Sequence, residues 1–581
     1  MAKPSPAEAE ESQEQPREST FGEAAAAYAF RRFGWASRFL SSKMPELPTQ
    51  IMKSGMTYST EAYLSLVVMV TVFTLPVVAV GLALAVLFRL PLLATIAIAP
   101  VLAFGLGLSY PSMIASGRSA ALDDELPFVV GYITVLASGG VSPIMTLKRL
   151  SNVSLYPKSA LEARRILMDI EIFANDPITA LEKAARYNPN RVFADFFGGY
   201  TSVLKTGGDT VDYMQSKVKD VFAYRAIKVK SAADTIGTFA ESYISVAVIL
   251  GIGLFVLFAV QTILGSASGA GSGGGGVQRI ILLTTVFNPA VSAVFIYISH
   301  SVQPKEPFNY YRPYFIFLAS VPIIPIAVIL PLHGVSLVYK LAAGLTLATL
   351  PGAIVSIREN RARGSLERMI PSFIRDIAEV RKTGLAPEKC IEQVATRNYG
   401  GLSRVVSGMA SELSWGIPLR QIVQGIMKKT RSWMTQATMF LLSEVVDVGG
   451  GTPEMLGTLA DFVERTAQID KEKKSQLRPY VFIPYFGAIM IVVTTVLMVY
   501  FLTSPVITGQ GYNPFSSGIN AASITSPMLA GAVFTSWIMG FVAGKMGEGS
   551  IAAGFKHASL LAAVSGIVVF IATVFFKIPG V

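Results

Sequence analysis

The sequence predicts an all-α, polytopic membrane protein with about nine transmembrane helices and two repeated helical bundle domains on the cytoplasmic side. Three observations predict this class. Hydrophobic residues make up 52% of the 581 residues and charged residues only 15%, and the mean hydropathy of +0.51 lies outside the range of soluble domains. Long apolar runs alternate with two long polar segments. Those segments show the helical spacing of apolar residues and no alternating run long enough for a strand.

The N-terminal segment, residues 1–60, is expected to lie in the cytosol. It begins with the acidic, Pro/Gln-rich stretch MAKPSPAEAEESQEQPREST, which contains no apolar run of signal-peptide length. The following stretch AYAFRRFGWASRFL, Ala27–Leu40, has the composition of a basic amphipathic helix. We expect a disordered tail followed by a helix that lies on the membrane surface.

Nine apolar runs are long enough to cross about 30 Å of hydrocarbon at a helical rise of about 1.5 Å per residue. They cover residues 63–88, 90–111, 240–264, 278–300, 313–332, 335–357, 480–502, 526–544 and 558–576. The chain therefore divides into a first membrane pair and a first polar domain, then four spans, a second polar domain and three final spans. The boundaries are 61–116, 117–235, 236–357, 358–479 and 480–581.

The distribution of basic residues predicts sidedness. Of the 49 lysines and arginines, 45 fall in the N-terminal segment, the two polar domains and the short loops on the same side. The positive-inside rule places that side in the cytoplasm of a multi-pass protein of the cell membrane. Because the rule also accounts for most of the formal charge of +11, we expect the lipid bilayer and no nucleic acid as a partner.

The two polar domains repeat each other. The stretch Leu126–Leu150 aligns with Ile370–Val394 at an offset of 244, which pairs Gly140 with Gly384. The stretch VLKTGGDTVDYM aligns with VVDVGGGTPEML at an offset of 242, which pairs Gly207 and Gly208 with Gly449 and Gly450. A repeat of this length indicates two copies of one helical unit, each entered and left by membrane spans.

The glycine run DVGGGTPEML raises the question of phosphate binding. A phosphate-binding loop needs a lysine and a hydroxyl residue after its glycines, and neither follows Gly451 in the required order. Thr452, Pro453 and Glu454 instead have the residue types of a helix start. We therefore expect turns that act as hinges, and the candidates are Gly140, Gly207, Gly208, Gly384, Gly449, Gly450 and Gly451.

Catalytic chemistry is absent from the sequence pattern. One cysteine, Cys390, and three histidines, His300, His333 and His557, lie far apart in the sequence. No nucleophile–base pair or metal-ligand spacing is visible, so we predict no catalytic residue, no metal and no cofactor. The few charged residues inside the predicted spans, Glu241, Arg279 and Lys340, lie near span ends, which argues against a carrier of charged substrates. The spacing of Gly540 and Gly544 indicates close helix packing.

Several motifs resemble those of the F-type platform proteins of type II secretion and type IV pilus machines. They are the paired glycine turns, the tract SGMASELSWGIPLRQIV at Ser407–Val423, and the exit Leu459–Phe486. The layout is similar to the archaeal branch, which includes the platform proteins of the archaellum and of adhesion pili. The resemblance covers about residues 60–580, although Asp169–Ala185 departs from the LSWGIP form.

This resemblance implies a non-enzymatic platform, generally a homodimer. A hexameric cytosolic secretion ATPase would act through it to assemble pilin or archaellin subunits. An archaellum is favoured. The alternatives are an adhesion-pilus platform, a polytopic transporter or channel, and a membrane-embedded enzyme.

Basic clusters in the second domain are the candidate contacts for the ATPase. They are Arg361, Arg363, Arg368, Arg381, Lys382, Lys428, Lys429 and Arg431, with a further group at Lys471, Lys473 and Lys474. For each of them the alternative is a positive-inside anchor or a solvated helix face. Arg381 and Lys382 stand out because they lie beside Gly384 at a predicted turn, away from the membrane entry.

Overall fold

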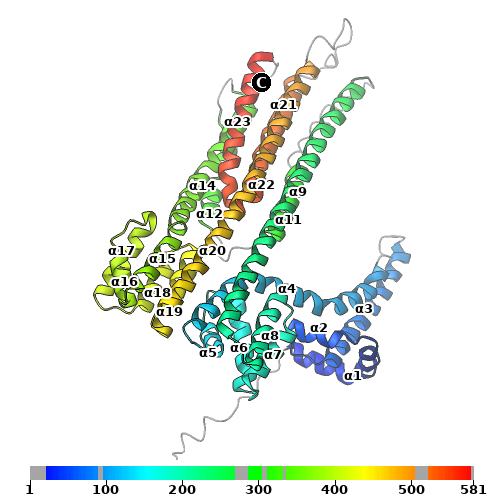
Figure 1. The fold of residues 1–581 in the computed structure, drawn as a ribbon. Coiled ribbons are helices and arrows are strands. Elements are labelled where there is room, and N and C mark those ends of the chain that lie inside the picture. The colour runs from blue at the N-terminus through cyan, green and yellow to red at the C-terminus, as the bar shows by residue number, and fades with distance from the viewer. Residues whose placement is uncertain are drawn as a thin grey trace, which may run out of the picture. The chain divides into compact units, whose positions relative to one another are not determined.

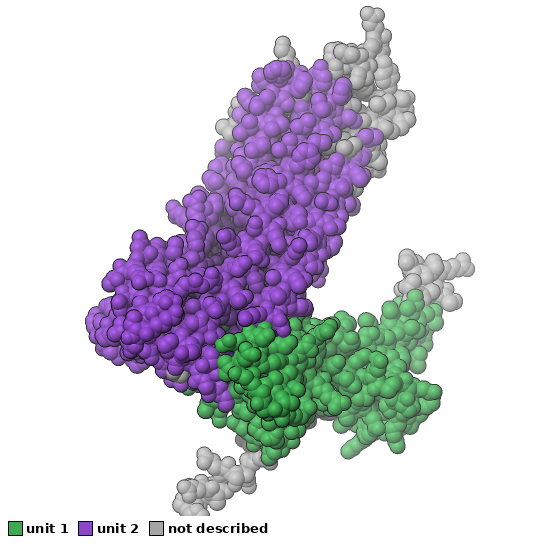
Figure 2. Space-filling view, viewed as in Figure 1, with its two compact units in different colours: residues 1–130, 143–217 green, residues 131–142, 218–581 purple. Residues whose placement is uncertain are grey.

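The computed structural model describes residues 21–88, 96–267, 286–303, 311–331, 335–503 and 521–576 (Figure 1). Within these residues the regular structure is helical throughout. The chain forms two compact units, coloured separately in Figure 2. Unit 1 comprises residues 1–130 and 143–217, and unit 2 comprises residues 131–142 and 218–581. The acidic tail, residues 1–20, and His333 lie outside the described residues.

Unit 1 begins with a helical group that contains the first two membrane segments. Its helices are α1 (Phe21–Lys43), α2 (Leu47–Ser54), α3 (Thr60–Phe88) and α4 (Ala99–Ala137), the last of which ends in unit 2. The predicted amphipathic helix is therefore present within α1. It packs on α3 and leaves Tyr28, Trp35 and Phe39 exposed. Its location on a membrane surface stays a prediction.

The rest of unit 1 is a bundle of short helices followed by the start of a long one. These are α5 (Pro143–Leu150), α6 (Pro157–Glu171), α7 (Pro177–Tyr187), α8 (Arg191–Thr206) and α9 (Thr210–Ala267). Side chains cap two of these helices: Asp176 accepts from two backbone amides of α7, and Asn190 accepts from one of α8. Arg118 of α4 pairs with the buried carboxylate of Glu162. This ion pair ties α4 to α6.

A corresponding bundle lies in unit 2. It contains α15 (Ile370–Arg381), α16 (Pro387–Val394), η3 (Gly400–Leu402), α17 (Ser403–Ser414), α18 (Leu419–Lys429), α19 (Trp433–Gly449) and α20 (Pro453–Leu477). In α15 the buried residues Ile370, Phe373, Ile374 and Ile377 follow the spacing of one helical face. That face packs on α20, where Arg375 of α15 also pairs with Glu464. The apolar stripe thus positions α15 in the bundle.

Apolar helices complete unit 2. They are α11 (Asn288–Val302), α12 (Arg312–Ser320), α13 (Ile323–Ile329), α14 (Leu337–Glu367), η4 (Arg478–Val481), α21 (Phe482–Thr503), α22 (Ala521–Glu548) and α23 (Ile551–Phe576). Helices α22 and α23 pack side by side (Figure 1). A Cβ added to Gly540 would meet Ala558 Cα at 2.2 Å, and one added to Gly544 would meet Gly554 Cα at 2.2 Å. The predicted close packing at these two glycines is therefore confirmed, and no larger residue fits at either position.

Seven helical stretches of the described residues are long and apolar enough to span a membrane. They overlap seven of the nine predicted spans, at Thr60–Leu84, Ile96–Ala137, Arg312–Ile329, Leu337–Arg381, Pro453–Phe501, Thr525–Glu548 and Ile551–Phe576. The chain is therefore an all-α, multi-pass membrane protein. Of the two remaining predicted spans, 240–264 lies within α9, and 278–300 includes residues 278–285, which lie outside the described part. They stay predictions.

The repeat extends helix by helix. The end of α4 corresponds to α15, and α5 to α9 correspond in order to α16 to α20. The capping residues also correspond, since Asn190 begins α8 and Ser432 begins α19 at an offset of 242. Even the tract that departs from the LSWGIP form makes the equivalent turn: Ala174 and Gly416, again 242 apart, both have positive φ, at 49° and 79°. The two tracts therefore share a backbone turn without sharing a motif.

The repeat alignment needs one correction at the second glycine turn. The sequence alignment paired Gly207 with Gly449, but the left-handed residue that ends α8 is Gly207 and the one that ends α19 is Gly450. The reason is that α19 has 17 residues and α8 has 16. The cap of the following helix shifts with it, from Asp209 in the first copy to Thr452 in the second.

Candidate functional site

Residues 131–142, at the end of α4, pack against the second bundle inside unit 2. Two glycines allow the close approach. A Cβ on Gly131 would meet the ring of Phe462 at 2.1 Å, and one on Gly139 would meet Met455 Sδ at 2.2 Å. Both partners lie on α20. The first helix of one repeat therefore packs directly on the last helix of the other.

A buried hydrogen bond strengthens this junction. The hydroxyl of Tyr132 donates to Glu444 Oε2 at 3.2 Å, and the two residues are 0% and 3% exposed. The ring of Tyr132 also stacks on Phe440, with centroids 6.0 Å apart. A buried carboxylate is costly unless it accepts hydrogen bonds. The pair therefore holds the last residues of α4, from Gly131 onward, against α19 within unit 2.

The two glycine turns of the second bundle lie next to each other. The guanidinium of Arg381 donates from Nε to Gly451 O and from Nη1 to Leu385 O, both at 2.7 Å. A Cβ on Gly451 would meet Pro387 Cγ at 2.7 Å. One side chain thus joins the turn that begins α16 to the turn that begins α20. Turns that are far apart in sequence form one structural unit.

The hinge candidates separate into two groups by backbone conformation. Left-handed φ angles occur at Gly140, Gly207, Gly384, Gly450 and Gly451, with values of 80°, 74°, 90°, 63° and 58°. Gly208 and Gly449 do not share this conformation, and Gly449 is the last residue of α19. The expected helix start is confirmed, because Thr452 Oγ1 accepts from Met455 N at 3.3 Å. Hinge motion at these turns stays a prediction.

The basic candidates also separate by environment. Arg361, Arg368, Lys428 and Lys429 are exposed. Lys382 is exposed but pairs with Glu379 at 2.8 Å, and Arg431 lies 3.6 Å from Glu359. Arg363 is half-buried against Glu367, and Lys474 pairs with Glu367 and Asp470. Lys471 is exposed and Lys473 is half-buried. The structure therefore presents only part of the predicted cluster as an open basic surface.

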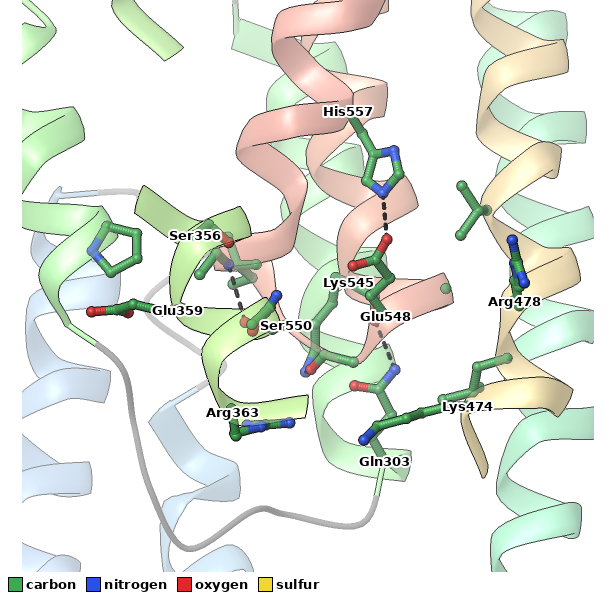
Figure 3. Close-up of a pocket in the computed structure, with 18 of the residues that line it drawn as sticks. Gln303, Ser356, Glu359, Arg363, Lys474, Arg478, Lys545, Glu548, Ser550 and His557 are labelled. Carbon is green, nitrogen blue, oxygen red and sulfur yellow. Dashed lines mark hydrogen bonds and ion pairs between the residues drawn. The ribbon is translucent and has the colours of Figure 1, made fainter. Parts of the chain in front are cut away.

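A cavity of about 1040 Å³ lies in unit 2, where α11, α14 and η4 meet the loop between α22 and α23 (Figure 3). Its lining includes the cations Arg363, Lys473, Lys474, Arg478 and Lys545 and the carboxylates Glu359, Glu367 and Glu548. Charges of both signs thus line one hollow beside apolar helices, where they hold each other in place.

Two histidines face this cavity. Glu548 Oε1 lies 3.0 Å from His557 Nε2 and 2.5 Å from Lys556 Nζ, and the Tyr485 hydroxyl lies 2.7 Å from His557 Nδ1. On the other side, Lys545 Nζ lies 3.3 Å from His300 Nδ1. Two sets of polar contacts, both of which include a residue of α22, thus join α22 to α11 on one side and to α21 and α23 on the other.

Sequence reasoning missed this network. The predicted spans 526–544 and 558–576 left Lys545 and Lys556 between them, and the histidines were treated as unrelated. The structure instead buries Lys545 to 4% exposure in the last turn of α22. One part of the network could have been inferred from the sequence. Glu548 follows Gly544 and Gly547, and a turn at this point would bring His557, nine residues later, close to Glu548. His300 could not be linked to it, because the pairing crosses 245 residues of sequence.

Comparison with known families explains the duplicated bundle. Two separate stretches, residues 130–258 and 373–500, match the family model described as "Type II secretion system (T2SS), protein F". The chain carries two protein F domains. The first F domain runs from the end of α4 into α9, and the second runs from α15 into α21. Each matched stretch therefore contains the helical bundle together with the long helix that leaves it.

An uncharacterized protein of Methanocaldococcus jannaschii is similar to most of the chain. The two are 20% identical over 493 residues, which cover 78% of this chain and 80% of the relative. The similarity therefore reaches well beyond either F domain alone. No solved structure matches the chain.

Proposed function

We propose that this protein is the integral-membrane platform of an archaeal type IV-like filament machine, and that the filament is an archaellum. The main support for this proposal is the pair of F domains. Each F domain is continuous with a long helix that contains a membrane span or a predicted one. In this role both F domains lie in the cytoplasm, where a hexameric ATPase binds them. The role is non-enzymatic, and the protein acts as a homodimer that moves pilin or archaellin subunits out of the membrane.

The continuity of α20, η4 and α21 supports mechanical coupling. These elements run from the glycine turn at Gly450–Gly451 to residue 503 with no intervening loop. A helix transmits a push along its axis because its hydrogen bonds are internal. A movement of the turn held by Arg381 would therefore reach the membrane helices. The left-handed glycines permit such a change of angle, because glycine populates both signs of φ.

A deletion strain tests the platform role. Cells that lack the gene should produce no surface filaments by electron microscopy, and the wild-type gene should restore them. The full-length protein in nanodiscs should also retain the purified cognate ATPase. Normal filaments in the deletion strain, together with no retention of the ATPase, would exclude a platform role.

The same strain distinguishes the two kinds of filament. Loss of swimming with adhesion unchanged supports the archaellum, and loss of attachment with swimming unchanged supports an adhesion pilus. A transporter would leave both phenotypes intact and would show substrate flux in proteoliposomes.

A further inference from the structure

The turn between α17 and α18 holds a tryptophan away from the rest of the protein. Trp415 is 76% exposed and directly follows the last residue of α17. The turn is well defined: Gly416 has a φ of 79° and donates its amide to Leu413 O at 2.8 Å, and the amide of Ile417 donates to Glu412 O at 3.2 Å. A large aromatic ring on an ordered turn is ready for binding, because little backbone freedom is left to lose.

The first F domain places an aromatic ring at the same point of the repeat. Phe173 lies 242 residues before Trp415 and is 66% exposed, and Ala174 after it has a φ of 49°. A residue with a Cβ in this conformation costs about 1–2 kcal/mol. An exposed ring adds little to folding. Both repeats of the chain therefore carry an exposed aromatic residue directly before a left-handed residue, although the exposed ring adds little to folding.

The two turns differ in the charge around them. Residues 403–431 contain five cations, at Arg404, Arg420, Lys428, Lys429 and Arg431, and one acid, Glu412. The equivalent residues 161–189 contain four cations and five acids. Within the described part of the chain, Arg404, Arg420, Lys428 and Lys429 are exposed and take part in no ion pair. Only the second turn therefore lies in a surface that attracts an acidic partner.

The surroundings of Trp415 favour a protein over a membrane. Its exposed neighbours on α17 and α18 are small or polar, namely Ser407, Ser411, Ser414, Gln421 and Gln424. A helix that lies on a membrane needs a broad apolar face, such as α1 displays with Tyr28, Trp35 and Phe39. One tryptophan within a polar and cationic rim is instead the arrangement of a protein-binding hot spot.

We propose that Trp415 and the basic α17–α18 hairpin form the docking point for an acidic surface of the cytosolic ATPase, with the indole ring as the anchor. This inference rests on the proposed platform function and adds the surface and the chemistry of the contact. Arg420 lies beside the turn, and Lys428 and Lys429 at the other end of α18 steer the acidic partner. In the first F domain, Phe173 lies in a segment with no excess of positive charge and does not form this anchor.

The test measures the affinity of the purified cognate ATPase for the full-length protein in phosphatidylcholine nanodiscs. Trp415→Ala should raise Kd by about tenfold or more, and the matched Phe173→Ala in the other repeat should change it by less than about threefold. Lys428→Glu with Lys429→Glu should weaken binding and flatten its salt dependence. Because both rings are exposed, neither alanine variant should change Tm.

Each contrary outcome has a distinct meaning. If the wild-type protein binds the ATPase and Trp415→Ala binds it equally well, the docking point is overturned while the platform function stands. If the wild-type protein binds no ATPase, this inference fails, and the platform function fails with it when the deletion strain also forms normal filaments. A second measurement compares wild type with Trp415→Phe in nanodiscs that contain brominated lipid. The fluorescence that wild type shows and Trp415→Phe lacks belongs to Trp415. If brominated lipid quenches that fluorescence, the ring lies in the membrane and the docking point is also overturned.

Discussion

Arg381 Nε lies 2.7 Å from the carbonyl oxygen of Gly451, which it reaches across 70 residues of sequence. The contact joins the two glycine turns of the second F domain into one unit. It also separates Arg381 from its neighbour Lys382, which points to Glu379 on the exposed face of the same helix. The two residues were predicted as an equivalent docking pair, and their surroundings now give them different expected roles.

Removal of the Arg381 guanidinium should loosen the two turns. Arg381→Ala loses hydrogen bonds to Gly451 and Leu385, at a cost of about 1–3 kcal/mol. Hydrogen–deuterium exchange should accelerate at the amides that follow Gly450, and filament assembly should fall. The matched control Lys382→Ala breaks only an exposed pair, which is worth less than about 1 kcal/mol. Equal exchange in the two variants would contradict a joining role for Arg381.

The conformation at Gly450 should matter more than the space around it. A Cβ added to Gly450 would meet no atom within 4 Å, but the φ angle of this residue is 63°. Gly450→Val places a β-branched residue in a left-handed conformation and should lower Tm and impair filament assembly. Gly450→Asn tolerates this conformation and should retain most of the stability. Loss of filaments in both variants would indicate that the glycine is needed for motion rather than for conformation.

A substitution at the strained turn of the first F domain should raise the stability of the folded protein. Ala174→Gly relieves an unfavourable φ of 49°, which costs an L-residue about 1–2 kcal/mol. Glycine also gives the unfolded chain more freedom, which offsets about 0.5–1 kcal/mol of that gain. We expect a small rise in Tm. The reciprocal change Gly416→Ala, at a φ of 79°, should lower Tm. The two shifts, measured by thermal unfolding in detergent, should have opposite signs, and a fall in Tm for Ala174→Gly would contradict the strain.

Cys390 should ionise only at alkaline pH. Burial raises the pKa of this thiol above its usual range, and the nearby charge of Arg381 opposes that shift only in part. The folded protein favours the neutral thiol. The resulting stabilisation is fully present below about pH 8.5, the pKa of the thiol in the unfolded chain, and is lost as the pH rises through the higher pKa of the thiol in the folded protein. The difference in thiolate absorbance between wild type and Cys390→Ala measures the midpoint. A midpoint at or below the unfolded value would contradict the burial effect.

The helices of this chain could be predicted because their signals are local. Apolar runs located seven spans that the described residues contain, and the residue types Thr452-Pro453-Glu454 gave the start of α20. The repeat also predicted a duplicated bundle, because each copy has its own glycine turns.

The contacts between distant residues could not be predicted in the same way. The approach of His300 to Lys545 and the hydrogen bond of Tyr132 to Glu444 join residues 245 and 312 positions apart, and no periodicity encodes such pairings. The exposed position of Trp415 was missed for a related reason. A tryptophan in a short apolar tract is usually buried, and only the packed helices show which side of the turn faces outward.

The placement of residues 131–142 in unit 2 has a practical consequence for anyone who expresses part of this chain. A fragment of residues 358–479 looks like a complete soluble domain, but it would leave the ring of Phe462 and the side chain of Met455 uncovered where Gly131 and Gly139 pack. The carboxylate of Glu444 would also lose Tyr132. Such a fragment is expected to aggregate or to bind non-specifically. Fusing it to the Gly131–Ser142 segment should restore solubility.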